Sequence, residues 1–161
     1  LHAGHYGAKE VTGVDISAFA CEFATENARL NGLENVVHFV EANAFDLLAE
    51  QSRAGVKYDV VILDPPAFTK TRSAIEAATR GYKEINLRAM KMVKPGGYLI
   101  TCSCSQHILP DAFMQIVRDA AHDAHVQLRQ VEYRTQGRAH PILPAAPETQ
   151  YLKCGIFQIF D

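Results

Sequence analysis

The sequence has no apolar run of the roughly 18 residues that a membrane span requires. The charged residues Lys9, Glu10 and Asp15 interrupt any apolar stretch near its start. These absences argue against a transmembrane segment and a signal peptide in the given sequence, so we expect no membrane partner. The formal net charge of −2 is not that of a basic nucleic-acid-binding module. Contact with a nucleic acid would therefore need a local basic patch or another domain.

Cysteine is scarce and poorly spaced for cross-links or metal binding. The four cysteines are Cys21, Cys102, Cys104 and Cys154. Two of them stand two residues apart in a strand-like run, which is a poor disulfide framework, and no further ligands have zinc-site spacing nearby. The simplest interpretation is a reduced, cytoplasmic setting without a metal.

What the sequence does contain is an alternation of strand-like and helix-like segments, without repeats or low-complexity stretches. The 161 residues and the 48% apolar content suit a single domain over residues 1–161. The expected strands are residues 11–16, 36–41, 58–63, 98–103, 126–134 and 151–160, and the expected helices are residues 17–30, 45–52, 75–93 and 111–122. Such alternation predicts an α/β fold with a mostly parallel sheet.

The end of the chain departs from this alternation. The last two expected strands are joined only by a loop over residues 139–148, which contains three prolines. This predicts an antiparallel pair at the C-terminal side of the sheet. A mostly parallel sheet with such a pair is the outline of the Rossmann-like class I methyltransferase fold.

The beginning of the chain predicts an incomplete sheet. Residues 1–7 look like the end of a helix, and no strand with a glycine-rich turn precedes the strand at residues 11–16. In an open α/β sheet, the first strand and its turn hold the cofactor. We expect upstream sequence to supply them, because a central strand without its neighbour leaves backbone groups unpaired.

Two strand ends carry residues suited to an adenosine group. Asp15 ends a β-branched strand, where a carboxylate can accept both hydroxyls of a ribose while Ile16 packs on an adenine face. Asn43, Ala44 and Phe45 follow the next strand and can bracket the edge and face of an adenine. Helix capping and core packing explain the same residues when each is taken alone.

The segment from Asp64 to Phe68, with the sequence Asp-Pro-Pro-Ala-Phe, is the most specific motif. The apolar run before it is typical of a central strand that is covered on both faces. Pro65 and Pro66 have fixed φ angles and form a preorganised wall. With Phe68, they can hold a flat, polar base beside a methyl donor, and Asp64 can accept a hydrogen bond from, or share a proton with, the edge of that base. The alternative is a rigid turn with a helix cap.

Cys102 and Cys104 lie at the end of the next expected strand. Period-two geometry puts both on one side while the chain is extended, and Cys104 lies nearer the carboxyl edge, where ligands bind in this architecture. Methylation of carbon 5 of a pyrimidine needs a cysteine, because a thiolate that adds to carbon 6 makes carbon 5 nucleophilic. A small buried hydrophobe is the alternative, and it suits Cys102 better.

One basic concentration accompanies these motifs. It comprises Lys70, Arg72, Arg80, Lys83, Arg88 and Lys91. These side chains can contact phosphates, although a solvated helix face explains several of them equally well.

Several motifs in one order resemble those of a known family. They are Asn27-Ala28-Arg29-Leu30-Asn31-Gly32-Leu33, Asp64-Pro65-Pro66-Ala67-Phe68, Arg80-Gly81-Tyr82-Lys83-Glu84-Ile85-Asn86, Ser103-Cys104-Ser105, and Pro147-Glu148 with Tyr151-Leu152-Lys153. Together they resemble the large-subunit ribosomal RNA cytosine-C5 methyltransferases, whose catalytic domain follows a small RNA-binding PUA domain. The likeness covers nearly the whole chain.

The resemblance implies a role for each group of residues. Asp15 would bind the ribose of S-adenosylmethionine, and Asn43 with Ala44 would meet its adenine. Asp64 would lie between the methyl donor and the target base, and Cys104 would be the nucleophile. The residues that would shape the RNA-facing site are Pro65, Pro66, Phe68, Lys70, Arg80, Tyr82 and Lys83. The target cytosine would be flipped into the pocket.

The sequence departs from the family at three points. The glycine-rich first motif and the PUA domain are absent from residues 1–161, and Asn43 stands where an acid is common in relatives. Three alternatives stay open: methyl transfer to a nitrogen or to guanine, which needs no cysteine; a non-catalytic RNA-binding or assembly module; and a nicotinamide dehydrogenase. Only Asp15 supports the last of these.

Overall fold

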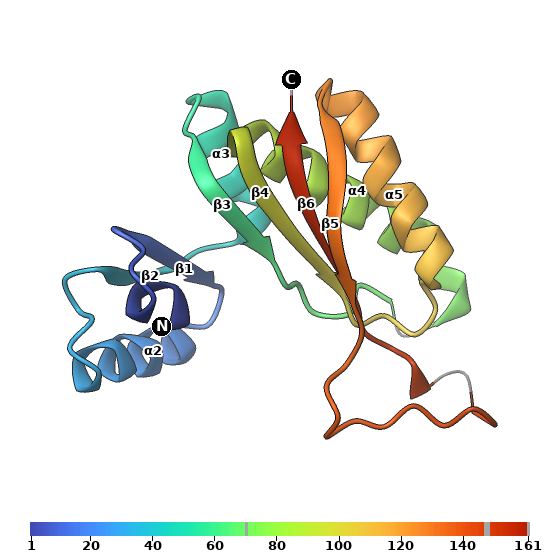
Figure 1. Cartoon of the computed structure of the whole chain (residues 1–161), viewed down its shortest axis with the longest axis horizontal. Helices are drawn as coiled ribbons and strands as arrows, with labels where there is room; N and C mark the ends of the chain where they lie inside the picture. Colours follow the sequence, from blue (N-terminus) through green and yellow to red (C-terminus); the bar gives the residue numbers. More distant parts are fainter. Residues whose placement is uncertain (70, 147–148, 161) are drawn as a thin grey trace. The chain divides into compact units, whose positions relative to one another are not determined.

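The computed structural model describes residues 1–69, 71–146 and 149–160. Lys70 and the Pro147-Glu148 pair, both singled out in the sequence, lie outside these residues. The chain divides into two compact units, Leu1–Glu50 and Gln51–Asp161 (Figure 1). The single domain expected from the length stays a prediction, and each unit is described by itself.

The N-terminal unit is a two-stranded parallel sheet with a helix packed on it. Its elements are α1 (His2–His5), β1 (Val11–Asp15), α2 (Ala18–Leu30), β2 (Val37–Glu41) and the first residues of α3 (Ala44–Arg53). The strands pair in register from Val11 opposite Val37 to Asp15 opposite Glu41. Parallel pairing brings the carboxyl ends of both strands to one edge, where the expected adenosine-binding residues follow.

Close contact across this small sheet requires a glycine. A Cβ atom at Gly13 would lie 2.6 Å from the ring carbons of Phe39 on β2, so any other residue there would require the Phe39 ring to move. Helix α2 begins at a Ser17 cap, whose hydroxyl accepts from the backbone N–H of Ala20 at 3.2 Å. It ends before Gly32, whose φ of +66° suits glycine.

The C-terminal unit is a mixed four-stranded sheet. Its elements are β3 (Tyr58–Leu63), the 3-10 turn η1 (Arg72–Ala74), α4 (Ile75–Met92), β4 (Val93–Ser103), α5 (Pro110–Ala124), β5 (Gln127–Arg134) and β6 (Lys153–Phe160). The strand order is β3-β4-β6-β5. Strands β3 and β4 are parallel, whereas β6 runs antiparallel to both of its neighbours. The predicted mixture of parallel strands with an antiparallel C-terminal pair is confirmed.

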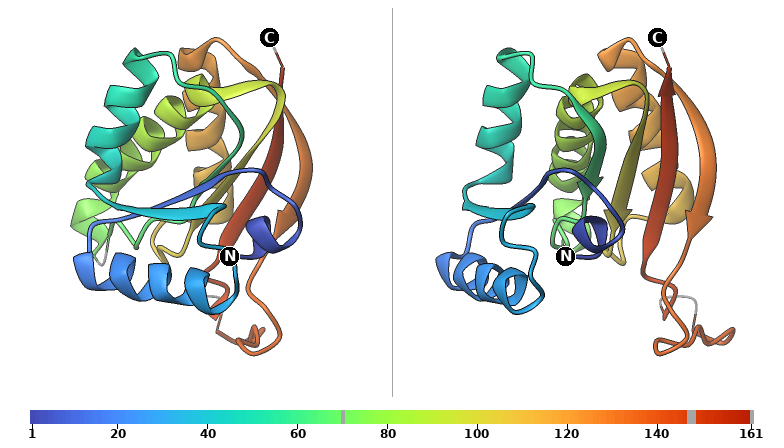
Figure 2. Two further views of the ribbon diagram at one scale, coloured as in Figure 1. Left: turned by 90° about the vertical axis from the view of Figure 1, so that its left-hand side faces the viewer. Right: turned by 60° about the vertical axis from the view of Figure 1, so that its left-hand side comes forward.

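Helices cover one face of this four-stranded sheet (Figure 2). Helix α4 packs against β3 and β4, and α5 packs against α4 and β5. The core of the unit lies beneath the helices and includes Tyr82, Met90, Leu99, Phe113, Val117 and Phe157, each at most 2% exposed. Burial alternates along β4 and β6, as expected for strands with one covered face.

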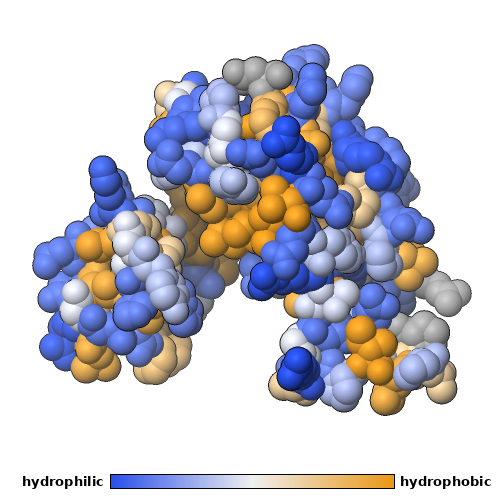
Figure 3. Space-filling view, viewed as in Figure 1, coloured by the Kyte–Doolittle hydropathy of each residue, from blue (hydrophilic) through white to orange (hydrophobic). Residues whose placement is uncertain are grey.

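The other face of the sheet carries apolar side chains that solvent reaches. Val60 is 47% exposed, Ile62 is 60% exposed and Tyr98 is 38% exposed. Apolar surface is visible over this face in Figure 3. The apolar run of β3, which predicted a strand covered on both faces, is therefore covered on one face only by the described residues.

The boundaries of the expected elements agree with the structure to within one residue, except at two strand starts and at the end of α5, which continues to Ala124. Strand β4 begins at Val93 instead of Tyr98, because the chain passes through Gly96 at a φ of +80° and resumes pairing with a register shift. Strand β6 begins at Lys153 instead of Tyr151, because the ladder ends where Ser103 faces Lys153. None of the described helices is long and apolar enough to cross a membrane.

Candidate functional site

Asp15 and Asn43 lie at the carboxyl ends of the two parallel strands of the N-terminal unit. One carboxylate oxygen of Asp15 accepts from the backbone N–H of Ser17 at 2.8 Å. The Asn43 side-chain oxygen accepts from the backbone N–H of Phe45 at 2.9 Å. Each polar side chain therefore shapes the turn that follows its strand, as the capping alternative predicted. Both residues nevertheless remain exposed, so a ligand can reach them as well.

The adjoining apolar residues are also open to solvent. Ile16 is 72% exposed and Phe45 is 37% exposed, whereas Ala44 is partly buried. An exposed isoleucine directly after a strand-end carboxylate offers an apolar surface next to a hydrogen-bond acceptor. This combination fits an adenosine, because its adenine ring can pack on the apolar surface and its ribose hydroxyls can donate to the acceptor.

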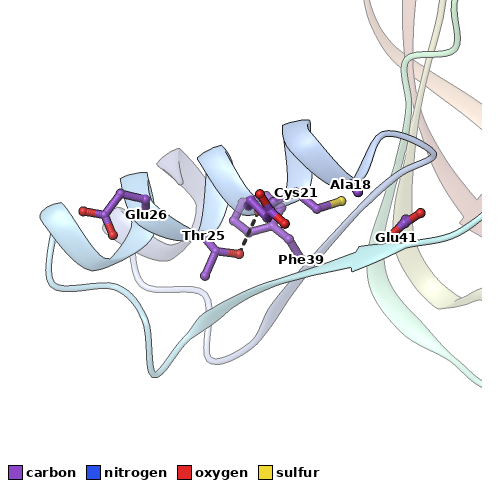
Figure 4. A pocket seen from close by; sticks show the side chains of 7 residues that line it. Ala18, Cys21, Thr25, Glu26, Phe39 and Glu41 are labelled. Carbon is purple, nitrogen blue, oxygen red and sulfur yellow. Dashed lines mark hydrogen bonds between the residues drawn. The ribbon is translucent and has the colours of Figure 1, made fainter.

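A shallow hollow elsewhere on the N-terminal unit is acidic (Figure 4). It is lined by Ala18, Cys21, Glu22, Thr25, Glu26, Phe39 and Glu41. The Thr25 hydroxyl donates to the backbone carbonyl of Cys21 at 2.8 Å, and a hydrogen bond from Arg29 lowers the pKa of Glu26. Three carboxylates repel phosphate and other anions, and Ile16 and Asn43 are not among the lining residues. Among the described residues, no group of three or more His, Cys, Asp or Glu side chains could hold a metal ion.

Asp64 and Cys104 are presented by neighbouring parallel strands of the C-terminal unit. Leu63 pairs with Thr101, so Asp64 follows at the level of Cys102. Side chains alternate between the two faces of the sheet, and the odd-numbered Leu63, Thr101 and Ser103 are the buried ones. The side chains of Asp64 and Cys104 are therefore expected on the other face, opposite α4 and α5. The charge of Asp64 acts on the Cys102 thiol, as expected when both share one face.

Cys102 and Cys104 differ in their surroundings. Cys102 faces Cys154 across the antiparallel β4–β6 ladder. Burial, and then a hydrogen bond with Cys154, raises the pKa of the Cys102 thiol far above its usual range. A raised pKa favours the protonated form of Cys102, which is the less reactive form of a thiol. Cys104 lies beyond the last paired residue and is only half-buried, which leaves it as the better candidate nucleophile.

A buried polar network holds the turn that carries Cys104. Ser103 and Ser105 are both fully buried, and the backbone N–H of Ser105 donates to the Ser103 hydroxyl at 3.3 Å. The Tyr82 hydroxyl on α4 lies 2.9 Å from the Ser105 hydroxyl. The two serines of the Ser-Cys-Ser segment therefore fix the backbone on both sides of the cysteine.

Tyr82 connects this network to the motif that follows β3. Its side chain is fully buried, so its expected part in shaping the RNA-facing site stays a prediction that does not involve an exposed side chain. Its ring centroid lies 4.5 Å from that of Phe68 while its hydroxyl bonds to Ser105. A helical tyrosine in the sequence gives no sign of whether it points to solvent or to the core. Burial of Tyr82 follows from the packing of α4 on the sheet.

Three cations of the expected basic patch are paired with carboxylates. Lys83 pairs with Asp123 on α5 at 2.7 Å, which holds its ammonium at the α4–α5 contact. Arg80 pairs with Glu76, and Arg88 pairs with Glu84. These three cations therefore have acidic neighbours, as the solvated-helix alternative predicted, and these exposed pairs contribute little to stability.

Lys153, to which the sequence reasoning assigned no role, contacts the turn that carries Cys104. It is 2% exposed, and its ammonium donates to the backbone carbonyls of Ser105 at 2.6 Å and Tyr151 at 2.8 Å. The alternation of residues along β6 could have identified it, because Lys153 shares the buried side of the strand with Gly155, Phe157 and Ile159. A lysine in that phase is unusual, because lysine is almost never fully buried without a partner.

Known proteins of one family are similar to this chain. Residues 3–147 match the methyltransferase domain family. The chain is 43% identical over 154 residues to "Ribosomal RNA large subunit methyltransferase I" of Shewanella denitrificans, and 44% identical over 154 residues to the protein of that name in Aeromonas salmonicida. In both cases the match covers 95% of this chain and 39% of the relative. The chain thus spans about two fifths of the length of these curated relatives.

Solved structures agree on the fold. The structure of SMU.776 complexed with SAH superposes with a TM-score of 0.81 at 16% identity, covering 94% of this chain and 40% of that one. NSun6 from Pyrococcus horikoshii with SFG gives a TM-score of 0.67 at 20% identity, covering 92% of this chain and 41% of that one. The Rossmann-like methyltransferase fold expected from the strand order is therefore confirmed.

Proposed function

Because this chain belongs to the methyltransferase domain family, we propose that it transfers a methyl group from S-adenosylmethionine to carbon 5 of a cytosine in ribosomal RNA. The proposed reaction passes through a covalent adduct with Cys104. One observation carries this proposal: Asp64 and a half-buried Cys104 follow neighbouring parallel strands on one face of the sheet. The names of the curated relatives support ribosomal RNA as the substrate class.

The N-terminal unit supplies the groups for the adenosine part of the methyl donor. The exposed Asp15 carboxylate would accept from the ribose hydroxyls, and Ile16 would pack on the adenine ring, with Asn43, Ala44 and Phe45 at its edge. The SAH bound to SMU.776 supports a donor of this type. When bound, S-adenosylmethionine supplies an electrophilic methyl group on a positively charged sulfur.

The Cys104 thiolate makes the cytosine reactive. It forms a bond from sulfur to carbon 6, and the electron pair of the 5,6 double bond moves to give a nucleophilic carbon 5. Once carbon 5 carries the methyl group, a base removes its remaining proton. The electrons of that carbon–hydrogen bond restore the double bond, the carbon–sulfur bond breaks, and the thiolate returns to Cys104.

The rigid segment after β3 would position the base. Pro65 and Pro66 restrict the backbone beside Asp64, and Phe68 is fixed by its contact with Tyr82. The exposed Asp64 carboxylate would accept a hydrogen bond from the polar edge of the cytosine. A preorganised wall of this kind holds a flat ring in one orientation, which is what methyl transfer to a single carbon requires.

Contacts to the remainder of the RNA would come largely from elsewhere in the protein. The net charge is −2, and Arg80 and Lys83 of the expected basic patch already have acidic partners. The greater length of the curated relatives is consistent with a further RNA-binding domain, such as the PUA-type domain expected from the sequence.

Replacement of Cys104 tests the proposal. In the protein that contains this chain, we expect Cys104→Ala to lower methyl transfer to ribosomal RNA by roughly 10³-fold or more, because the step that activates carbon 5 is lost. The measurement is transfer of radiolabelled methyl groups to RNA from cells that lack the gene. Cys102→Ala is the matched control and should retain activity.

A trapping experiment tests the adduct itself. RNA that contains 5-fluorocytosine should form a stable covalent complex with the wild-type protein, because fluorine cannot leave as a proton does, and the Cys104→Ala protein should form none. Full methylation by Cys104→Ala would rule out the carbon-5 mechanism. It would favour methylation of a nitrogen or of guanine, which needs no cysteine.

A further inference from the structure

The segment between β5 and β6 leaves the sheet beside the candidate nucleophile, Cys104. Lys153 opens β6 and pairs with Ser103, the residue before the cysteine. Strand β5 ends at Arg134, whose partner in the ladder is the next residue of β6. Both ends of the segment therefore lie at the carboxyl edge of β4. Figures 1 and 2 show that it projects beyond this edge of the sheet, and we call residues 136–146 the projecting loop.

Hydrogen bonds hold the projecting loop in place. The Thr149 hydroxyl accepts from the backbone N–H of Leu143 at 2.8 Å and donates to the carbonyl of Ala146 at 2.7 Å. The Gln136 side chain donates to the Thr149 carbonyl. At its base, the Lys153 ammonium binds one carbonyl just before β6 and one carbonyl of the cysteine turn. The loop is therefore tied both to itself and to the turn that carries the cysteine.

The projecting loop presents apolar and cationic side chains to solvent. Ile142 is 41% exposed and Leu143 is 53% exposed, and Arg138 and His140 are exposed as well. No ion pair within the described residues includes Arg138 or His140. Glu148 is the only carboxylate in the sequence between β5 and β6, and it lies outside the described residues. Exposed apolar side chains with a polar rim are typical of a binding surface.

This combination of side chains fits a strand of RNA. An arginine without an acidic partner can bind a phosphate, and a histidine ring can stack on a base. Isoleucine and leucine are among the side chains that wedge between bases where a stack is opened. A base that is turned out of its stack leaves such an opening. A purely apolar partner would gain nothing from the cation, so charge complementarity favours a polyanion.

We propose that the projecting loop contacts the RNA strand beside the target base. Arg138 binds a phosphate, and Ile142 with Leu143 packs against the bases that flank the extruded one. The proposal rests on the proposed function for RNA as the partner, but it does not depend on which atom of the base receives the methyl group. It places one RNA contact within this chain, next to Cys104, in addition to those expected from the remainder of the protein.

Replacement of Arg138 tests the phosphate contact. In the protein that contains this chain, Arg138→Gln should weaken binding of ribosomal RNA from cells that lack the gene by about three- to tenfold. It should also reduce the slope of log affinity against log salt by about 1. The measurement is filter binding at several salt concentrations without a methyl donor. Arg118→Gln is the matched control, because Arg118 is an exposed arginine on α5, and it should bind as the wild type does.

Replacement of Leu143 tests the apolar contact. Leu143→Gln should weaken binding of the same RNA by roughly tenfold, because the flanking bases lose a packing surface. Val131→Gln is the matched control, since Val131 is 55% exposed on β5, and it should bind as the wild type does. Thermal unfolding should be the same in both variants. Lower stability of Leu143→Gln with unchanged RNA binding would show that the loop covers another part of the protein, which would overturn the proposal.

The two binding measurements separate this proposal from the chemistry at Cys104. Wild-type affinity in both Arg138→Gln and Leu143→Gln would overturn the RNA contact and leave the methylation mechanism intact. Weakened binding in these variants supports the contact even if Cys104→Ala retains full methylation, a result that would exclude only the carbon-5 mechanism.

Discussion

The two units hold their candidate ligand-binding residues in different ways. In the N-terminal unit, Cys21, Ala28 and Val37 are the buried hydrophobic residues, while Phe19 is 76% exposed and Phe23 is 63% exposed. The turns after its strands are fixed by hydrogen bonds that span two or three residues. Its candidate site thus depends mainly on local sequence.

The C-terminal unit depends on long-range contacts instead. Its Cys104 turn is held by Tyr82, which is 23 residues away, and by Lys153, which is 48 residues from Ser105. These side chains are almost fully buried. The comparison teaches that the turn that carries Cys104 requires the whole C-terminal unit to fold, whereas the strand-end turns of the N-terminal unit can form from short segments.

Among the substitutions that test this difference between the units, Tyr82→Ala should cause the largest loss of stability. Loss of a fully buried aromatic side chain should destabilise the C-terminal unit by roughly 3–5 kcal/mol. Hydrogen exchange with mass spectrometry should show loss of amide protection in β4 and β6. Tyr82→Phe is the matched control, because it removes only the hydroxyl that meets Ser105 and should cost about 1 kcal/mol. Equal protection in Tyr82→Ala and the wild type would contradict the long-range account.

The pH dependence of stability should sharpen the role of Lys153. Its pKa falls from the ordinary 10.5 to about 8 in the folded chain, so between these pH values the unfolded chain binds a proton that the folded chain has lost. Stability from this group therefore rises as pH increases from 8 to 10.5, and its contribution is constant below 8. We expect a gain of roughly 3 kcal/mol relative to Lys153→Met, measured by urea unfolding of both proteins across this range. A constant difference would show that the lysine is not desolvated.

Ser17→Ala tests the local side of the comparison. Removal of the cap of α2 should cost about 1 kcal/mol of helix stability, because the Ala20 N–H loses its side-chain acceptor. Ser17→Asp should retain most of the cap. Exchange rates of amides in the first turn of α2 provide the measurement. Substitution of the exposed Phe19 by alanine should change stability by less than about 0.5 kcal/mol. A larger loss than that caused by Ser17→Ala would mean that packing, not capping, holds this helix.

Features that depend on short stretches of sequence were predicted well. The β-branched or apolar runs identified β1, β2 and β3, and the Asn31-Gly32 pair marked the end of α2. The proline-rich loop predicted the antiparallel arrangement of β5 and β6. Asp15, Asn43 and Asp64 were expected at strand ends. Asp15 ends β1, Asp64 directly follows β3, and Asn43 lies two residues after the end of β2. Such short-range signals predict local structure well, because they arise from backbone sterics and local hydrogen bonds.

Features that depend on which side chains meet were not predictable in the same way. Tyr82 was expected to help shape the RNA-facing site, and the sequence did not indicate that its side chain lies in the core. Lys83 was grouped with phosphate-binding residues, but it pairs with Asp123. Lys153 was assigned no role, although it is the cation bound to the Cys104 turn. In each case a polar side chain has several possible partners, and only the packing of α4, α5 and β6 selects one.

The sequence alone therefore determined the order and type of the elements, the strand ends that carry Asp15 and Asp64, and the chemical capacity of a cysteine at position 104. Tertiary structure decided that Asp64 and Cys104 share a face, that Cys102 is paired with Cys154, and that buried Tyr82 and Lys153 support the turn. The physical reason is range. Periodicity and capping act over a few residues, whereas register, burial and charge coupling arise only when distant strands and helices are packed together.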